Sequence, residues 1–355
     1  MATIGKRSGR DATTVRVSTR LTLGTAVALL FAAPGTGAGQ GGDVCSKTAR
    51  AQFVACQHEV KASRFTGKAI CLNASNAEER KQCLAELKAA QREEGIELCG
   101  EQRDARLDLC DALGETPYVP DFTPAKFDAD FTNLTSPNPY FPLAIGNRWQ
   151  YVGGDETNTI EVLDKTKLIE GVTCIVVHDV VEVGGVKTED TDDWFGQAKD
   201  GSVYYCGESS GSFETFAGDD PEEPELVSVE GSWKGGRDGA KPGILFLGTP
   251  TVGASVRQEW LVDTAEDAAT VLSTTYGFGS DPELDELVPQ ALAQLLCAND
   301  CVVTREFSTI EPGDFERKYY ARGIGLFLEV DPEAGEVNQL VDCNGDPKCA
   351  ALPIP

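Results

Sequence analysis

The twelve cysteines of this 355-residue chain fall into two blocks of six, and this division constrains the fold more than any other feature. The first block lies in a charged stretch and holds Cys45, Cys56, Cys71, Cys83, Cys99 and Cys110. The second lies in an acidic, strand-patterned stretch and holds Cys174, Cys206, Cys297, Cys301, Cys343 and Cys349. An even number in each block predicts two separate sets of disulfides, which persist outside the reducing cytoplasm.

The first 38 residues have the order of a secretory signal peptide. Five basic residues precede the apolar run Leu21–Ala33, and the small residues from Thr36 to Ala38 then offer a cleavage site. This run of 13 residues is too short to cross a bilayer as a helix, which takes ~20. We therefore predict a signal peptide over residues 1–38, no membrane span in the mature chain, and a secreted or periplasmic location.

Charge also divides the chain in two. Residues 45–114 hold 11 basic and 11 acidic residues, whereas residues 115–355 hold 15 basic and 44 acidic ones. An excess of negative charge repels phosphate backbones, so we expect no nucleic-acid partner. A cation or a basic protein is the partner that this charge favours, and solubility is the simpler explanation that stays open.

Residues 43–114 are predicted to form a Cys-rich helical domain. The stretch from Ser75 to Leu113 is rich in Ala, Glu, Lys, Arg, Gln and Leu, which are good helix formers. We expect two or three antiparallel helices stapled by three disulfides, with a break or bend at Gly95 and Gly100.

The pairing of these six cysteines stays open, because six cysteines allow fifteen pairings. One hairpin register would pair Cys56 with Cys83 and Cys45 with Cys99. A metal or haem site is the alternative, but the stretch has no C-x-x-C motif and one histidine, His58. We therefore expect the sulfur atoms to brace the fold rather than to perform chemistry.

Residues 115–145 form a linker rich in proline and aromatic residues. Its six prolines are Pro117, Pro120, Pro124, Pro137, Pro139 and Pro142. Proline fixes the backbone in extended conformations, and the interleaved Tyr and Phe side chains need a surface to contact. The segment is therefore predicted to be an extended strap that lies on the rest of the protein.

Residues 146–350 are predicted to form an antiparallel β domain. Short strand patterns alternate with turn signals, and the most apolar run, Val172–Val183, ends at Gly184. The order of a meander favours a sandwich or a half-open barrel. Together with the helical region before it, the chain belongs to the α+β class.

One helix and three disulfides are expected within the β domain. A helical pattern near 282–296 is predicted to be a helix kinked at Pro289. Two cysteine pairs are close enough in sequence for local bridges, Cys297 with Cys301 and Cys343 with Cys349. That leaves Cys174 and Cys206 to pair across strands.

Several short motifs resemble a family of secreted bacterial proteins of unknown function. They are NPYFPL at 138–143, RWQYVGG at 148–154, GVTC at 171–174, DDWFGQAKDGSVYYCGE at 192–208, EGSW at 230–233, DGAKPGI at 238–244 and RKYYARGIGLFLEV at 317–330. The resemblance covers most of residues 138–341 and brings no known activity. It implies that the cysteine-rich head is a variable addition.

The sequence offers little for catalysis. Residues 207–211 match G-x-S-x-G, but a hydrolase of that type needs a histidine after the serine, and none follows Ser209. The two histidines, His58 and His178, are too few for a transition-metal site. No P-loop or dinucleotide fingerprint is present. We therefore name no catalytic and no cofactor-binding residue, and expect no cofactor other than calcium.

Calcium is the candidate ligand, through two clusters of oxygen-bearing side chains. Asp342, Asn344 and Asp346 have the spacing that opens a calcium loop, although Pro347 and Pro353 occupy positions where the loop needs other residues. The second cluster consists of Asp190, Asp192 and Asp193. Solvated turns are the alternative interpretation of both.

These observations favour an exported, non-catalytic binding or structural protein stabilised by disulfides, with calcium or a basic protein as its ligand. One alternative is an extracellular hydrolase that uses carboxylates or calcium. The other is a carrier whose half-open barrel holds an apolar ligand. A pocket lined by two carboxylates near Trp194 or Trp233 would favour the hydrolase, and an empty apolar pocket would favour the carrier.

Overall fold

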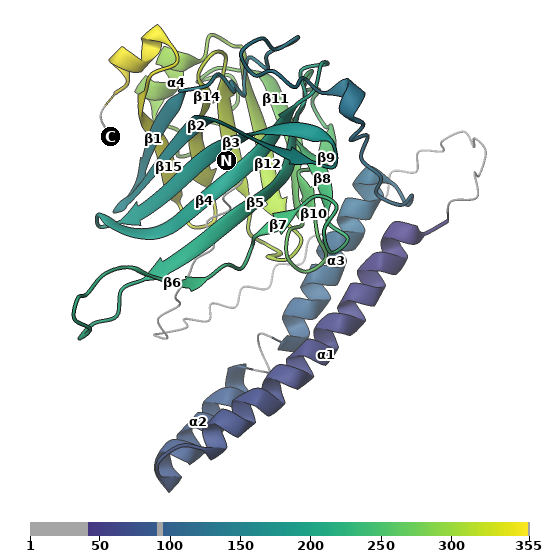
Figure 1. The fold of residues 1–355 in the computed structure, drawn as a ribbon, viewed down its shortest axis with the longest axis vertical. Helices are drawn as coiled ribbons and strands as arrows, with labels where there is room; N and C mark the ends of the chain where they lie inside the picture. Colours follow the sequence, from purple (N-terminus) through teal and green to yellow (C-terminus); the bar gives the residue numbers. More distant parts are fainter. Residues whose placement is uncertain (1–41, 91–94, 354–355) are drawn as a thin grey trace.

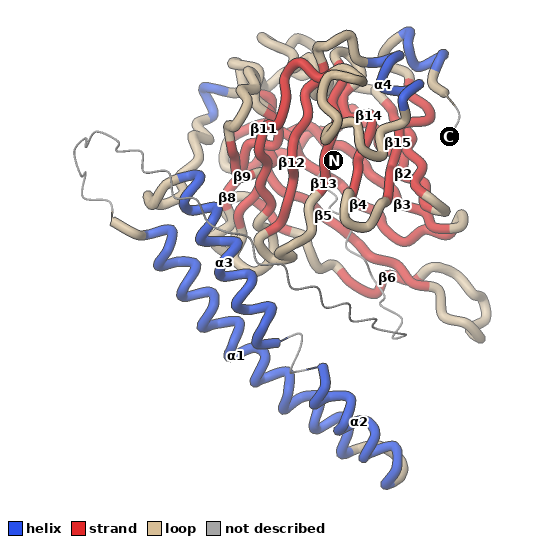
Figure 2. The backbone as a smooth tube through the Cα atoms, turned by 180° about the vertical axis from the view of Figure 1, so that it is seen from behind, coloured by secondary structure: helices blue, strands red, loops and turns tan. Residues whose placement is uncertain are grey.

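The computed structural model describes residues 42–90 and 95–353. The predicted signal peptide lies outside these ranges. The described chain has two parts, a projecting helical arm and a β barrel, which Figures 1 and 2 show from opposite sides. The fold is therefore α+β, as predicted, with a disulfide-stapled helical region followed by a mainly antiparallel β body.

The helical arm contains three helices held by three disulfides. The helices are α1 (Val44–Leu72), α2 (Ala77–Ala90) and α3 (Ile96–Leu113). The disulfides are Cys45–Cys110, Cys56–Cys99 and Cys71–Cys83. The register that paired Cys56 with Cys83 and Cys45 with Cys99 is wrong, because α1 spans 29 residues and packs along both α2 and α3.

Of the two glycines expected to interrupt the arm, one lies where the helices separate and the other does not. Gly95 precedes the first residue of α3, whereas Gly100 lies inside that helix. Glycine in a helix costs about 1 kcal/mol relative to alanine. Good helix formers on both sides and the neighbouring disulfide at Cys99 offset this cost.

The strap at 115–145 lies on the barrel, with its aromatic rings buried. Phe127 stacks edge-on against Phe122 at 4.9 Å and against Tyr204 of the barrel at 5.0 Å. Further along, Tyr140 and Phe141 join the main core. A short 3-10 turn, Pro124–Lys126, is the one helical element that the structure assigns within these residues.

The barrel is built from fifteen strands in antiparallel pairs. They are β1 (Arg148–Gly153), β2 (Glu156–Ile169), β3 (Val172–Val183), β4 (Val186–Gln197), β5 (Val203–Glu214), β6 (Glu225–Ser228), β7 (Trp233–Lys234), β8 (Lys241–Phe246), β9 (Ser255–Arg257), β10 (Glu259–Trp260), β11 (Asp267–Tyr276), β12 (Cys301–Ser308), β13 (Glu316–Ala321), β14 (Gly325–Asp331) and β15 (Glu336–Cys343). Their order around the sheet is β10-β8-β5-β4-β3-β2-β1-β15-β14-β13-β12-β11-β9, with β6 and β7 pairing to β5.

One segment of six residues nearly closes this sheet into a barrel. The two end strands, β9 and β10, are consecutive in the chain, so Ser255–Trp260 pairs with β11 on one side and with β8 on the other. We name this stretch the closing segment. Gly243 of β8 has to be a glycine here, because a Cβ atom would lie 2.3 Å from the backbone of Gln258.

Strand alternation sorts the side chains into an inner and an outer layer. The inner row of β3 includes Ile175 and Val177, which belong to the large core inside the barrel. The outer row includes Cys174 and Val176, which pack in a smaller cluster under the strap. The Cys174–Cys206 disulfide lies in this outer cluster and confirms the predicted cross-strand pair.

The helix predicted near 282–296 is shorter than expected. The structure places α4 at Gln290–Leu296 and gives residues 282–287 as turns. Proline disfavours helical conformation in the residue before it, so Pro289 begins the helix instead of kinking it. The local disulfides Cys297–Cys301 and Cys343–Cys349 are confirmed. The second one holds a 3-10 turn at Pro347–Ala351.

A buried ion pair attaches the arm to the barrel. Arg106 of α3 donates to Glu266 at 2.7 Å and to Asp263 at 2.8 Å, and both Arg106 and Glu266 are at most 3% exposed. Glu266 also accepts hydrogen bonds from Gln52 of α1 and from Thr309. Burial alone would raise the pKa of Glu266, but the hydrogen bond from Arg106 holds it below its usual value.

Candidate functional site

The structure separates the predicted calcium ligands of the first cluster. Asp190 and Asp192 lie on the outer face of β4, where Asp192 contacts Nδ1 of His178 at 3.0 Å. Asp190 forms an ion pair with Lys187 at 2.9 Å. Asp193 is the next residue in the same strand, so its side chain points to the opposite face, into the barrel. The three aspartates therefore do not converge on one point.

The second predicted cluster has structural contacts. The side-chain oxygen of Asn344 accepts a hydrogen bond from the backbone of Arg148, and Asp346 accepts one from the backbone of Lys348. Asp342 lies 3.9 Å from the guanidinium of Arg148. Within residues 42–90 and 95–353, no group of three or more His, Cys, Asp or Glu side chains is placed to hold a metal ion. Calcium binding stays a prediction.

The G-x-S-x-G match at 207–211 lies entirely within β5. Ser209 pairs with Asp192 in the middle of a regular ladder. A hydrolase serine of this type needs a sharp turn between a strand and a helix, which exposes its hydroxyl. The match is therefore a coincidence of composition in a strand.

The most unusual chemistry lies inside the barrel, toward one end. Eight strands contribute carboxyl side chains there. Five of these side chains are buried, namely Asp179 (β3), Asp193 (β4), Glu259 (β10), Asp267 (β11) and Glu306 (β12), and three are partly exposed, namely Glu208 (β5), Glu316 (β13) and Glu329 (β14). We name this set the acidic end. A row of acids around the inner wall is uncommon, because a buried charge needs compensation.

Lys318 compensates one side of the acidic end. Its ammonium group is fully buried and lies 3.0 Å from Glu329 and 3.5 Å from Glu306 and Glu316. Burial alone would lower the pKa of Lys318, but the three carboxylates raise it well above its usual value. Lys318 therefore remains charged, while burial raises the pKa of Glu316 to about 8.

A tyrosine hydroxyl bridges two carboxyl groups on the other side. Tyr205 lies 2.5 Å from Oδ1 of Asp193 and 2.8 Å from Oε2 of Glu208. The hydroxyl has one proton to donate, so both contacts are hydrogen bonds only when one carboxyl group carries a proton. Burial and the charge of Asp193 raise the pKa of Glu208 to about 8. With a proton on Glu208, its carboxyl group would donate to Tyr205, and Tyr205 would donate to Asp193.

Glu259 of the closing segment and Asp267 of β11 form a further pair of acids. Burial and the nearby Asp267 raise the pKa of Glu259 well above its usual value. Burial likewise raises the pKa of Asp267 to about 7, although a hydrogen bond from Ser308 opposes the shift. Both carboxyl groups therefore tend to hold protons near neutral pH.

Asp179 has the least support of the eight. It is 1% exposed and faces the amide of Asn158, and none of the basic side chains that the structure describes forms an ion pair with it. Burial and the charges of Asp193 and Glu189 raise the pKa of Asp179 to about 8. A buried carboxyl group without a positively charged partner costs free energy, so Asp179 lowers the stability of the fold.

Sequence analysis did not single out Asp179, although a signal was present. In VTCIVVHDVVEV the alternation of a strand puts Asp179 in the same row as Ile175, Val177 and Val181. An acid in an otherwise apolar row is the pattern that would have identified it. The sequence analysis instead considered the neighbouring His178, whose side chain lies in the outer row of the strand.

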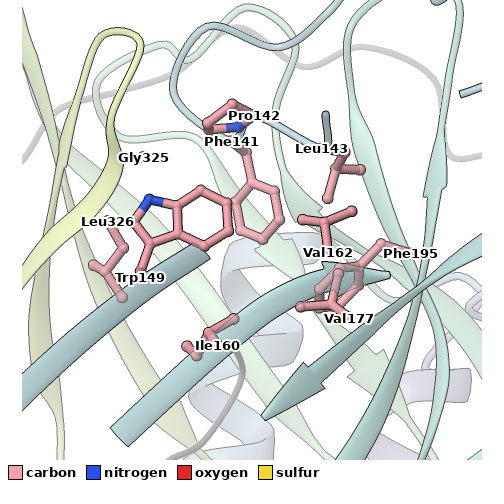
Figure 3. Close-up of a pocket in the computed structure, with 10 residues that line it drawn as sticks. All are labelled: Phe141, Pro142, Leu143, Trp149, Ile160, Val162, Val177, Phe195, Gly325 and Leu326. Atoms are coloured by element: carbon pink, nitrogen blue, oxygen red, sulfur yellow. The ribbon is translucent and has the colours of Figure 1, made fainter. Parts of the chain in front are cut away.

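Two cavities of the barrel are small and apolar. One has a volume of about 10 Å³, and Figure 3 shows it between Trp149, Phe141 and Phe195. A second of similar size lies between β8 and β11. A volume of about 10–15 Å³ holds one water molecule. An apolar ligand would therefore have to displace core side chains, and neither cavity is lined by a carboxylate.

Fold and site together define a disulfide-stapled, nearly closed antiparallel barrel with a helical arm and an acidic interior end. No family model matches the chain, and neither does any curated protein or solved structure. None of the described helices is long and apolar enough to span a membrane.

Proposed function

We propose that this is an exported binding protein whose acidic end receives a positively charged group. The observation that supports this most directly is Asp179, a buried carboxyl group that faces other carboxyl groups and the amide of Asn158 and forms no ion pair with a described basic residue. A cation at that position would supply the interaction that the fold leaves out.

The charge balance of the acidic end supports the same proposal. Eight carboxyl groups surround one ammonium group, that of Lys318, and several hold protons near neutral pH because burial raises their pKa values. A bound cation would take the place of these protons. Binding should therefore release protons and should strengthen as pH rises through 7 to 8.

Export is the second part of the proposal. All twelve cysteines form disulfides, which is typical of proteins that fold outside the reducing cytoplasm. The sequence of residues 1–38 has the order of a secretory signal. Mass spectrometry of the chain recovered from an expressing cell would show whether this segment is removed.

Calorimetric titration of the chain that begins after residue 38 tests the binding. The probes are calcium chloride and the diamine putrescine, each at pH 6 and at pH 8. We expect saturable binding of at least one probe that is at least tenfold tighter at pH 8, with proton release detected as a heat that depends on the buffer.

A pair of variants localises the effect. Asp179→Asn should weaken binding at least tenfold, since it removes the buried carboxylate that would face the cation. Asp192→Asn is the matched control, because Asp192 lies on the outer face of the neighbouring strand. No saturable binding of either probe at pH 8, or an equal loss in both variants, would overturn the proposal.

A further inference from the structure

The hairpin of β5 and β6 carries a free sheet edge outside the barrel. Among the described residues, β6 pairs with β5 and with no other strand, so the backbone groups on its far side have no strand partner. Figures 1 and 2 show this hairpin and its loop extending beyond the barrel wall. A free edge of this kind can accept an additional strand.

Three exposed side chains at this edge are apolar. Leu226 and Val227 of β6 are 56% and 43% exposed, and Val229, just after the strand, is 62% exposed. Leu226 and Val227 are neighbours in a strand and so point to opposite faces, which puts an exposed apolar side chain on each face of β6. Proteins usually protect an edge with Lys, Pro or a bulge that turns it away. Neither lysine nor proline occurs in Glu225–Ser228, and its pairing with β5 has one register shift, between Ser212 and Phe213 of β5.

Acidic residues surround the edge. The stretch from residue 214 to 233 contains seven acidic residues and no Lys or Arg: Glu214, Asp219, Asp220, Glu222, Glu223, Glu225 and Glu230. A second copy of the chain would bring the same negative charge to the interface and be repelled. A basic segment would be attracted.

We propose that β6 is a docking edge for an extended, basic segment of a partner protein. The segment adds as a strand to the free edge, with its main chain hydrogen-bonded to β6. Its apolar side chains cover Leu226 and Val227, and its lysine or arginine side chains lie beside the surrounding acids. This inference goes beyond the cation site of the acidic end and does not depend on it.

Binding of a synthetic peptide tests the inference. The probe is a fluorescent nine-residue peptide of alternating Lys and Val, measured by anisotropy at 150 mM salt. Two further peptides separate the contributions: one has Glu in place of Lys, and one is N-methylated at alternate residues. We expect the first to bind, and both others to bind at least tenfold more weakly, because they lose charge attraction and main-chain hydrogen bonds respectively.

Variants of the protein localise the binding. The double variant Leu226→Ser with Val229→Ser should bind the Lys–Val peptide at least fivefold more weakly. In the parent protein, amide hydrogen exchange over residues 225–229 should slow when the peptide binds. Val119→Ser is the matched control, because Val119 is 77% exposed on the strap. Asp179→Asn should leave peptide affinity unchanged, so failure of the cation site would not affect this result.

Three outcomes would overturn the inference. The first is equal binding of the methylated and unmethylated peptides, which indicates attraction by charge alone. The second is the absence of binding by any of the peptides. The third is a concentration-dependent dimer that the Leu226→Ser and Val229→Ser double variant abolishes, which would make a second copy the occupant.

Discussion

Asp179 couples the stability of the barrel to pH through a single proton. Its pKa is about 8 in the folded chain, because burial disfavours the charged form. In the unfolded chain the same group titrates near 3.8. Between these two values the folded state holds a proton that the unfolded state releases. The contribution of Asp179 to the free energy of unfolding therefore falls as pH rises from about 4 to about 8.

Replacing this carboxyl group should stabilise the protein at alkaline pH. Asp179→Asn keeps the size of the side chain and removes the ionisation, so we expect a gain of about 1–3 kcal/mol at pH 8 and little change at pH 4. Thermal unfolding of both chains across this pH range, without added cations, measures the difference. A variant that is less stable than the parent at pH 8 would contradict the explanation.

At the scale of residues, sequence predicted side-chain chemistry less well than it predicted the fold. The interpretation grouped Asp190, Asp192 and Asp193 by their closeness in sequence, but neighbouring residues in a strand face opposite sides. The acidic end draws its members from eight strands that are distant in the chain. Such a set forms when the strands pair, so the spacing of residues in the sequence cannot reveal it.

At the scale of elements, the helical arm depends on its disulfides. The six cysteines join helices that carry few buried apolar side chains: in α1 the buried residues are Ser46, Ala49, Gln52 and Cys71. A small apolar interface contributes little stability. The crosslinks therefore replace a core that the arm does not have.

The two outer disulfides of the arm should differ in their contribution. Cys45–Cys110 closes a loop of 65 residues and Cys71–Cys83 one of 12. Loop-closure entropy predicts a loss of about 4 kcal/mol for the first and about 3 kcal/mol for the second when both cysteines become serine. Hydrogen exchange of the arm amides measures both losses. Equal protection in the two double variants would show that strain or residual structure outweighs loop length.

Structural elements were predicted correctly where residues close together in the sequence determine them. The sequence indicated three of the six disulfides correctly, because two bridge short loops and the third was the remaining pair. The helix predicted near 282–296 begins later, at Gln290. The prediction relied on the helical spacing of the apolar residues and did not allow for Pro289, which disfavours helical conformation in the residue before it. The pairing in the arm depended on relative helix lengths, which the spacing of cysteines does not provide.

At the scale of the whole molecule, a buried ion pair lies at the contact between the arm and the barrel. Removing Arg106 would leave the buried Glu266 without its ion-pair partner. We expect Arg106→Met to cost about 3–5 kcal/mol and to loosen the arm from the barrel. Urea unfolding and the radius of gyration in solution measure these effects.

A variant on the same helix serves as the control for this prediction. Arg103 is partly exposed and pairs with Asp104 at the surface. Arg103→Met should therefore cost less than about 1 kcal/mol. Similar losses in the two variants would show that the ion pair with Glu266 does not hold the arm. Partial recovery in a double variant of Arg106→Met with Glu266→Gln would support it.

The attachment point of the arm has a mechanical consequence. Arg106 binds Glu266, which is six residues after the closing segment, and Arg257 of that segment contacts the sulfur of Cys45 at the base of α1. Helix α1 has 29 residues and is thus about 43 Å long. A force applied at the far end of α1 would act through this length on the closing segment, where the short strands β9 and β10 complete the sheet. Tension on the arm would then separate the closing segment from β8 and β11 before it disturbs the long strands on the opposite side of the barrel.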